Sequence, residues 1–141
     1  MGFKHVIPQF ISKLIEMKKD KVSSFVSNGS LEATRAFCFI SDLIKGLRIL
    51  EETDLTKEIF HIGTNEEIKI EKLVDTLASI LSINVSNKTT LDSHIGGTSR
   101  RCPDITKMQS LGYSPTTSIL DGLEETCAWY LSSKKSSNEF L

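Results

Sequence analysis

The sequence predicts a single helix-rich, mixed α/β domain, and three observations carry that prediction. The chain has 141 residues, 39% of them apolar, which is enough for one buried core and short for two domains. Apolar residues recur at helical spacing from Ile70 to Leu81, as in an amphipathic helix. Aromatic and β-branched residues crowd 35–40 just before a second helical pattern, so a strand is expected to lead directly into a helix.

The same patterns predict the other elements in chain order. Helices are expected over 8–18, 42–50, 70–81, 104–111 and 117–132, and strands over 22–26, 35–40, 59–62 and 83–85. Ser41 or Asp42 can cap the second helix, and Gly112 ends the fourth. Residues 87–101 lack periodicity and are expected to form a loop, and the polar segment 132–141 is expected to be a disordered tail.

Charge and cysteine content exclude several classes of function. Lys and Arg number 17 against 18 Asp and Glu, so neither nucleic acid nor an acidic membrane surface is expected as a partner. Three cysteines without a Cys-x-x-Cys spacing predict no disulfide framework and no zinc knuckle, and they fit a reducing compartment. No apolar run approaches the roughly 18 residues of a membrane span, and no signal peptide is recognisable. The chain is therefore expected to be soluble and cytoplasmic.

No motif of a catalytic centre stands out. The sequence has no Gly-x-Ser-x-Gly, P-loop or Gly-x-Gly-x-x-Gly, and its three histidines lack the spacing of a metal site. A Cys–His pair of Cys102 and His94, as in a small hydrolase, would lack an orienting acid. The remaining candidates are Arg35, Arg100 and Arg101, whose guanidinium groups match phosphate oxygens, although surface ion pairs are the commoner use of such arginines.

Several segments follow one another in an order that is more specific than any one of them. They are His5-Val-Ile-Pro-Gln-Phe-Ile11, Thr34-Arg-Ala-Phe-Cys-Phe-Ile-Ser-Asp42, Phe60-His-Ile-Gly-Thr-Asn-Glu-Glu-Ile68, Arg100-Arg-Cys-Pro-Asp-Ile105 and Leu111-Gly-Tyr-Ser-Pro115. From Gly2 to about Leu131 the chain thereby resembles the C-terminal, substrate-binding part of the NAD-dependent sugar-nucleotide epimerases and dehydratases, which are extended short-chain dehydrogenases.

The resemblance implies what this chain holds and what it lacks. In the family, an N-terminal Rossmann domain carries the glycine-rich turn for NAD and the catalytic Tyr-x-x-x-Lys. Neither has a counterpart here, and the formal match of Tyr130 with Lys134 is interpreted as chance. Residues 1–131 are therefore expected to be the sugar-nucleotide-binding domain of a truncated family member, with the Rossmann domain absent. This chain is expected to bind no cofactor, although the complete family enzyme uses NAD.

The resemblance also implies roles for individual residues. Arg35 matches the arginine of the family's Thr-Arg-x-Phe segment, which contacts the diphosphate, and either Arg100 or Arg101 matches the second phosphate-binding arginine. Asp42 matches an acidic residue that follows the strand, with a structural role as a helix cap. The residues expected beside the nucleotide base are His5, Val6, Ile7 and Pro8 in one segment and Phe25 and Val26 in another. Where the family's turn often reads Gly-x-Gly, Leu31 stands two residues after Gly29.

Two functions follow as expectations. The first is a fragment of a sugar-nucleotide epimerase or dehydratase that binds a nucleoside diphosphate-sugar weakly and has no activity alone. The second is a stand-alone interaction or oligomerisation module that binds no sugar nucleotide. In either case a homo-oligomer or a missing N-terminal half is expected as partner. In relatives the segment from Arg35 to Leu50 packs on the nucleotide domain, so its apolar side chains are expected to face water here, namely Phe37, Phe39, Leu43 and Leu47.

Overall fold

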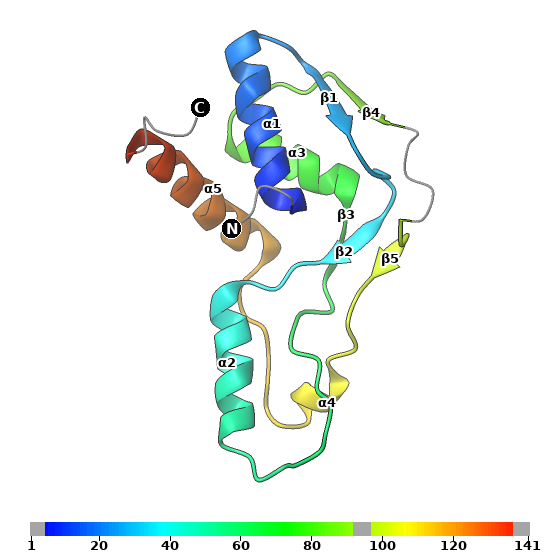
Figure 1. Cartoon of the computed structure of the whole chain (residues 1–141), viewed down its shortest axis with the longest axis vertical. Helices are drawn as coiled ribbons and strands as arrows, with labels where there is room; N and C mark the ends of the chain where they lie inside the picture. Colours follow the sequence, from blue (N-terminus) through cyan, green and yellow to red (C-terminus); the bar gives the residue numbers. More distant parts are fainter. Residues whose placement is uncertain (1–4, 92–96, 137–141) are drawn as a thin grey trace.

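The computed structural model describes residues 5–91 and 97–136, without the side chains of 133–136. Over these residues the chain forms helices and short strands in two lobes with a small sheet between them (Figure 1), so the predicted mixed α/β class is confirmed. In chain order the elements are α1 (Val6–Asp20), β1 (Ser24–Ser27), β2 (Thr34–Ala36), α2 (Ile40–Glu51), β3 (Glu67–Lys69), α3 (Ile70–Ile80), β4 (Asn87–Thr90), β5 (Arg100–Arg101), α4 (Thr106–Gln109) and α5 (Ile119–Ser136).

The larger lobe is held by the apolar faces of α1, α3 and α5. Leu73 and Leu77 of α3 are completely buried, and Leu14 of α1 and Leu123 of α5 join them in one cluster. Burying a leucine side chain contributes about 1.5–3 kcal/mol, so this cluster is the main source of the lobe's stability. β1 lies beside it and pairs in parallel with β4.

The smaller lobe has its own apolar cluster of Ile105, Met108 and Tyr113. Half-buried residues of α2 and of the segment 60–62 pack against this cluster. Gly46 of α2 makes the approach possible, because a Cβ atom at this position would lie 2.4 Å from Ile62 Cγ2. The C-terminal half of α2 therefore packs closely on this cluster.

A three-stranded sheet in the order β3-β2-β5 lies between the lobes (Figure 1). β2 runs antiparallel to β3, with Arg35 opposite Ile68, and parallel to β5, with Arg35 opposite Arg101. β2 continues through 37–39 into α2, and β3 continues directly into α3. This sheet carries all three arginines that the sequence singled out.

Two predicted strands are not where the sequence placed them. The segment 59–62 forms no strand, because Phe60 and Ile62 are half-buried by packing on the smaller cluster rather than by pairing. The strand expected over 83–85 lies at β4 instead. Ile83 and Val85 pack on the larger cluster as irregular chain, and the N–H of the next residue, Ser86, donates to Ser23 O just ahead of the β1–β4 ladder.

The short charged strands were also not predicted. β5 consists of two arginines that were expected in a loop, and no element was predicted over 67–69, where β3 lies. β2 is shorter than expected, since Phe39 O accepts the N–H groups of Asp42 and Leu43 and α2 begins at Ile40. Strands this short are defined by their ladder partners, which no local pattern reveals.

The helix predictions are closer. α1 and α3 are confirmed, α3 with the expected start at Ile70. α4 has only one turn, and α5 begins at Ile119 and continues to Ser136, into the segment expected as a tail; residues 137–141 of that segment lie outside the described residues. No helix in the described part of the chain is long and apolar enough to cross a bilayer.

Candidate functional site

Arg35 lies in the middle strand of the three-stranded sheet and is half-buried. Its Nη1 donates to Thr34 O at 2.6 Å, and its Nη2 donates to Thr98 O at 2.7 Å. The guanidinium group is thus held by main-chain carbonyls, and no acidic side chain among the described residues neutralises it. A cation that is fixed in this way is preorganised to meet an anion.

Arg100 is paired, unlike Arg35. Its Nη2 and Nε lie 2.5 Å and 3.0 Å from Glu67 Oε1, and the other carboxylate oxygen, Oε2, accepts the Thr34 hydroxyl at 2.8 Å. The hydrogen bond from Arg100, followed by that from Thr34, lowers the pKa of the Glu67 carboxyl, which stays ionised. Arg100 therefore forms the surface ion pair that the sequence analysis gave as the commoner use of such arginines.

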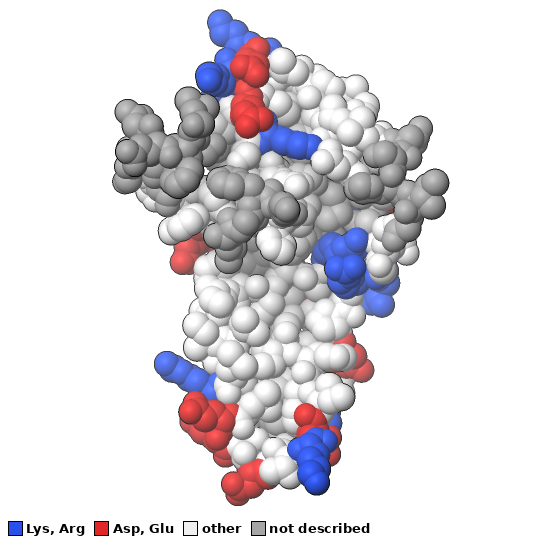
Figure 2. Space-filling model, in the orientation of Figure 1, with Lys and Arg blue, Asp and Glu red and all other residues white. Residues whose placement is uncertain are grey.

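Arg101 is exposed and lies opposite Arg35 in the parallel β2–β5 register. Residues opposite each other in a parallel pair point to the same face of a sheet, and neighbours along a strand point to opposite faces. Arg35 and Arg101 therefore share one face, and Arg100, Thr34 and Glu67 share the other. Figure 2 shows basic side chains at the edge of the molecule where Figure 1 places β5.

The residues expected beside a nucleotide base lie on other elements. His5 is exposed and directly precedes α1; Val6 and Ile7 are half-buried, and Pro8 is buried in the first turn. α1 packs against α3 and β1, and the structure does not join this segment to the arginine-bearing sheet by a hydrogen bond among the described residues. A contact of these residues with a base stays a prediction.

Phe25 and Val26 are neighbours on β1 with opposite environments. Phe25 is completely buried and packs edge-on against Phe10, with ring centroids 5.0 Å apart. It has no exposed surface with which to touch a ligand, so its role in the described structure is packing. Val26 is 38% exposed and lines a shallow groove of about 250 Å³ between α1 and β1.

The Cys–His pair is not supported as a catalytic arrangement. His94 lies outside the described residues. The Cys102 thiol is half-buried and points to the main-chain oxygen of Asn65, and burial together with the Glu67 charge raises its pKa. A raised pKa disfavours the reactive thiolate. Among the residues that the structure describes, no cluster of His, Cys, Asp and Glu could hold a metal ion.

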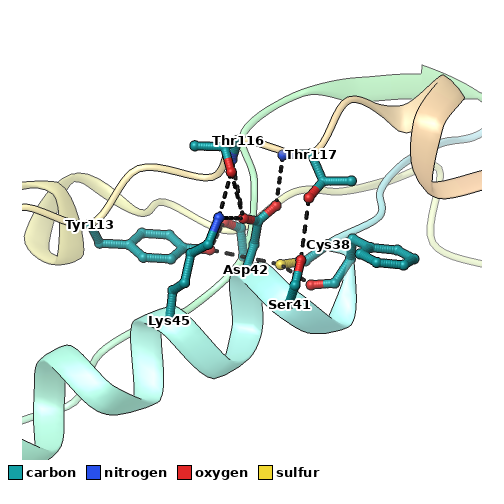
Figure 3. Close-up of polar contacts among 9 residues, drawn as sticks. Cys38, Ser41, Asp42, Lys45, Tyr113, Thr116 and Thr117 are labelled. Atoms are coloured by element: carbon teal, nitrogen blue, oxygen red, sulfur yellow. Dashed lines mark hydrogen bonds and ion pairs between the residues drawn. The ribbon is translucent and has the colours of Figure 1, made fainter.

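Asp42 is the centre of a buried polar network that the sequence did not reveal (Figure 3). Its side chain is 1% exposed and lies 2.9 Å from Lys45 Nζ. Its two carboxylate oxygens accept the main-chain N–H of Thr117 at 2.9 Å and both the N–H and the hydroxyl of Thr116 at 3.2 Å. The prediction that Asp42 caps its own helix is wrong, because it lies inside α2 and binds the segment that leads into α5.

The electrostatics of this network favour a charged Asp42. Burial alone would raise its pKa, but the hydrogen bonds from Lys45, then from the N–H groups of Thr117 and Thr116, outweigh burial and hold the pKa below its usual range. Beside it, Tyr113 donates its hydroxyl to Gly63 O at 2.8 Å and contacts Cys38 Sγ at 3.7 Å (Figure 3). Burial raises the pKa of Tyr113, so its hydroxyl stays protonated. The network ties α2 to the chain before α5.

One helix face is apolar and exposed. Ile40, Ile44 and Leu47 of α2 are 55%, 44% and 53% exposed, and their spacing places them on one side of the helix. Figure 2 shows few charged side chains over the first turns of α2. Of the four apolar side chains that were expected to face water, only Leu47 is exposed. The other three are half-buried, namely Phe37, Phe39 and Leu43.

Glu67 and Asp42 are the residues whose roles the sequence did not indicate. Glu67 lies on β3, a strand that no local sequence pattern predicts. Its partners Thr34 and Arg100 are each 33 positions away, one before it and one after it. Asp42 was singled out, but its partners Thr116 and Thr117 are more than 70 positions distant. No local spacing could have revealed these contacts.

No protein-family model matches the sequence. The chain is 29% identical over 128 residues to a putative GDP-L-fucose synthase of Arabidopsis thaliana, which covers 90% of this chain and 38% of that protein. The chain thus spans under two fifths of the length of this relative. Another relative, the UDP-glucuronic acid decarboxylase 5 of the same plant, is 33% identical over 91 residues, 64% of this chain and 26% of that protein.

Solved structures match the fold over nearly the whole chain. The dTDP-glucose 4,6-dehydratase of Streptomyces venezuelae with NAD bound superposes with a TM-score of 0.82 at 24% identity, over 98% of this chain and 42% of the other. The UDP-glucuronic acid 4-epimerase of Bacillus cereus, in complex with UDP-glucuronic acid and NAD, superposes with a TM-score of 0.76 at 27% identity, over 93% of this chain and 41% of the other. The homologues and the structural neighbours thus point to the same family.

Proposed function

Since this chain is homologous to the NAD-dependent sugar-nucleotide epimerases and dehydratases along nearly its whole length, we propose that it supplies the diphosphate-binding part of a sugar-nucleotide site. Arg35 and Arg101 are the residues that we assign to the phosphates. The ligand class is a nucleoside diphosphate-sugar. The chain alone holds it weakly, because the relatives form their sites from a protein more than twice as long.

The observation that carries this proposal is the register of Arg35 with Arg101. Two guanidinium groups on one face of a sheet place two positive charges side by side, which suits the two phosphates of a diphosphate, and the carbonyl partners of Arg35 leave its charge unneutralised. Arg35 is held in place by carbonyl oxygens, and Arg101 is exposed and extends from an edge strand. Arg100 is not assigned, because Glu67 already occupies its guanidinium group.

The described residues do not fit NAD. A dinucleotide fold places a glycine-rich turn between a strand and the helix that follows it. Here the two direct strand-to-helix junctions, 37–39 before α2 and the join of β3 with α3, contain no glycine. We therefore assign no NAD contact and no catalytic step to this chain, and we expect calorimetric titration with NAD to give no saturable binding tighter than about 100 μM, which corresponds to roughly 5.5 kcal/mol.

Ligand-observed NMR with UDP-glucuronic acid and GDP-mannose tests the proposal. Arg35 is half-buried and Arg101 exposed, so solvent weakens the contact of each with phosphate, and Arg35→Ala and Arg101→Ala should each weaken binding about fivefold to tenfold. Arg48→Ala is the matched control, since this arginine is exposed on α2 and outside the sheet. Uridine lacks phosphate, so its affinity should be the same for the wild type and for every variant. Equal affinity of the wild type and both sheet variants would remove the arginines from the site.

A second candidate function is an interaction module that binds no sugar nucleotide. The exposed apolar face of α2 favours it, because three large apolar side chains on one helix face are typical of a surface that another protein covers. This function accounts for Ile40, Ile44 and Leu47 but leaves the paired register of Arg35 with Arg101 without a role. Binding of a sugar nucleotide that depends on Arg35 would decide for the first function.

A further inference from the structure

We propose that Glu67 is a positioning residue that determines which of the two adjacent arginines of β5 faces the anion. This inference rests on the proposed phosphate site. Glu67 lies on the opposite face of the sheet from Arg35 and Arg101, so it touches no ligand there. Its effect on binding is exerted through Arg100.

The need for such a residue follows from the shortness of β5. The strand has two residues, pairs with β2 alone among the described elements, and lies at an edge of the sheet. Few ladder hydrogen bonds therefore fix its register. A slip by one residue would turn Arg101 to the back of the sheet and bring Arg100 to the front. Two neighbouring arginines make the two registers chemically similar, so the ladder alone discriminates poorly between them.

The Glu67 carboxylate supplies the discrimination. It reaches from β3 across β2, where one oxygen binds the Thr34 hydroxyl, and its other oxygen accepts two hydrogen bonds from Arg100. One side chain thus connects all three strands on the back face. The Glu67 side chain is 25% exposed against 66% for Arg100, so the pair is shielded from water mainly on the side of the carboxylate. With Arg100 held at the back, alternation along the strand turns Arg101 to the face of Arg35.

The sign of the effect separates this proposal from simple electrostatics. Replacing Glu67 by glutamine removes a negative charge near an anion site, which by itself would strengthen anion binding slightly. Arg100 would also be released and could join the ligand. If Glu67 positions β5, the same replacement weakens binding, because Arg101 no longer points steadily to the front. We expect affinity for UDP-glucuronic acid to fall about threefold to tenfold in Glu67→Gln, a larger effect than screened charge across the sheet produces.

The experiment combines binding with amide hydrogen exchange. Binding is measured for the wild type, Glu67→Gln, Arg100→Ala, Arg101→Ala and the double variant Glu67→Gln/Arg101→Ala. Glu67→Gln and Arg100→Ala should each weaken binding, and Arg101→Ala should cost less in the Glu67→Gln background than alone, because the two residues act on one contact. Glu32→Gln is the control, since Glu32 forms an exposed ion pair with Lys69 on the same sheet but does not touch β5.

Exchange is measured without ligand on the peptide that covers 99–102. Exchange there should speed up severalfold in Glu67→Gln and Arg100→Ala and stay unchanged in Glu32→Gln. Unchanged exchange in Glu67→Gln overturns the inference whatever the ligand does. Faster exchange with unchanged or tighter binding, while Arg35→Ala still loses binding, overturns it as well and leaves the proposed function standing. If no protein binds a sugar nucleotide, the proposed function fails, and Glu67 can no longer be a positioning residue for that site.

Discussion

Replacing Asp42 by alanine should destabilise the fold, and the size of the loss can be worked out from its contacts. The carboxylate accepts hydrogen bonds from Lys45, from the N–H and hydroxyl of Thr116 and from the N–H of Thr117. A hydrogen bond to a buried charge contributes about 1.5–3 kcal/mol net. Lys45 and Thr116 are exposed, so water can replace most of what they lose.

Thr117 is half-buried, so its main-chain N–H is the donor for which water least replaces the lost hydrogen bond. Removing the carboxylate also removes the cost of burying its charge, which offsets part of the loss. The expected loss is therefore about 2–3 kcal/mol at pH 7. Urea unfolding followed by far-ultraviolet circular dichroism measures it. Asp75→Ala is the control, because Asp75 is an exposed partner of Lys88 and its removal should cost less than about 1 kcal/mol.

The loss should also depend on pH in one direction. The pKa of Asp42 is lowered by folding, so its contribution is complete above the unfolded pKa of about 3.9 and disappears as the pH falls through the folded pKa. The difference between the wild type and Asp42→Ala should be roughly 1 kcal/mol smaller at pH 3 than at pH 7. A difference below about 0.5 kcal/mol at pH 7, or one that does not shrink at pH 3, would refute the reasoning.

Three further substitutions have expected outcomes. Gly46→Ala should destabilise by about 1–3 kcal/mol in urea unfolding although alanine favours helices, because its Cβ would clash with Ile62; a stabilised variant would contradict this. Tyr130→Phe should be neutral or up to about 1 kcal/mol more stable, since the buried hydroxyl has no hydrogen-bond partner among the described residues; a thermal melt would show a large loss if a partner exists. The wild type should self-associate when its concentration is raised from micromolar to hundred-micromolar in a sedimentation experiment. Leu47→Glu should reduce this self-association, because Leu47 is 53% exposed on the apolar face of α2. A wild type that stays monomeric at both concentrations would count against this face as an interaction surface.

The sequence predicted elements whose signal is local. α3 was placed correctly because its apolar period begins at Ile70. The helix predicted over 117–132 overlaps most of α5, at whose start Ser118 and Asp121 bond to each other. The strands depend on distant partners instead. β5 exists because Arg100 and Arg101 pair with Thr34 and Arg35, and no periodicity in 87–101 could reveal that. The paired placement of Arg35 with Arg101, the basis of the proposed site, is likewise a property of the sheet.

Both parallel strand pairs have a consequence for how this chain folds. Ser23 touches Ser86, and Arg35 binds Thr98, each across 63 positions of sequence. Closing loops of this length costs entropy before any contact is gained, so the sheets should form late and slowly relative to the helices. On a ribosome that adds about 5–20 residues per second, β1 and β2 emerge about 3 to 13 seconds before their parallel partners β4 and β5. During that interval the unpaired edges of β1 and β2 can pair with other chains. The yield of folded protein should therefore fall as the local concentration of incomplete nascent chains rises.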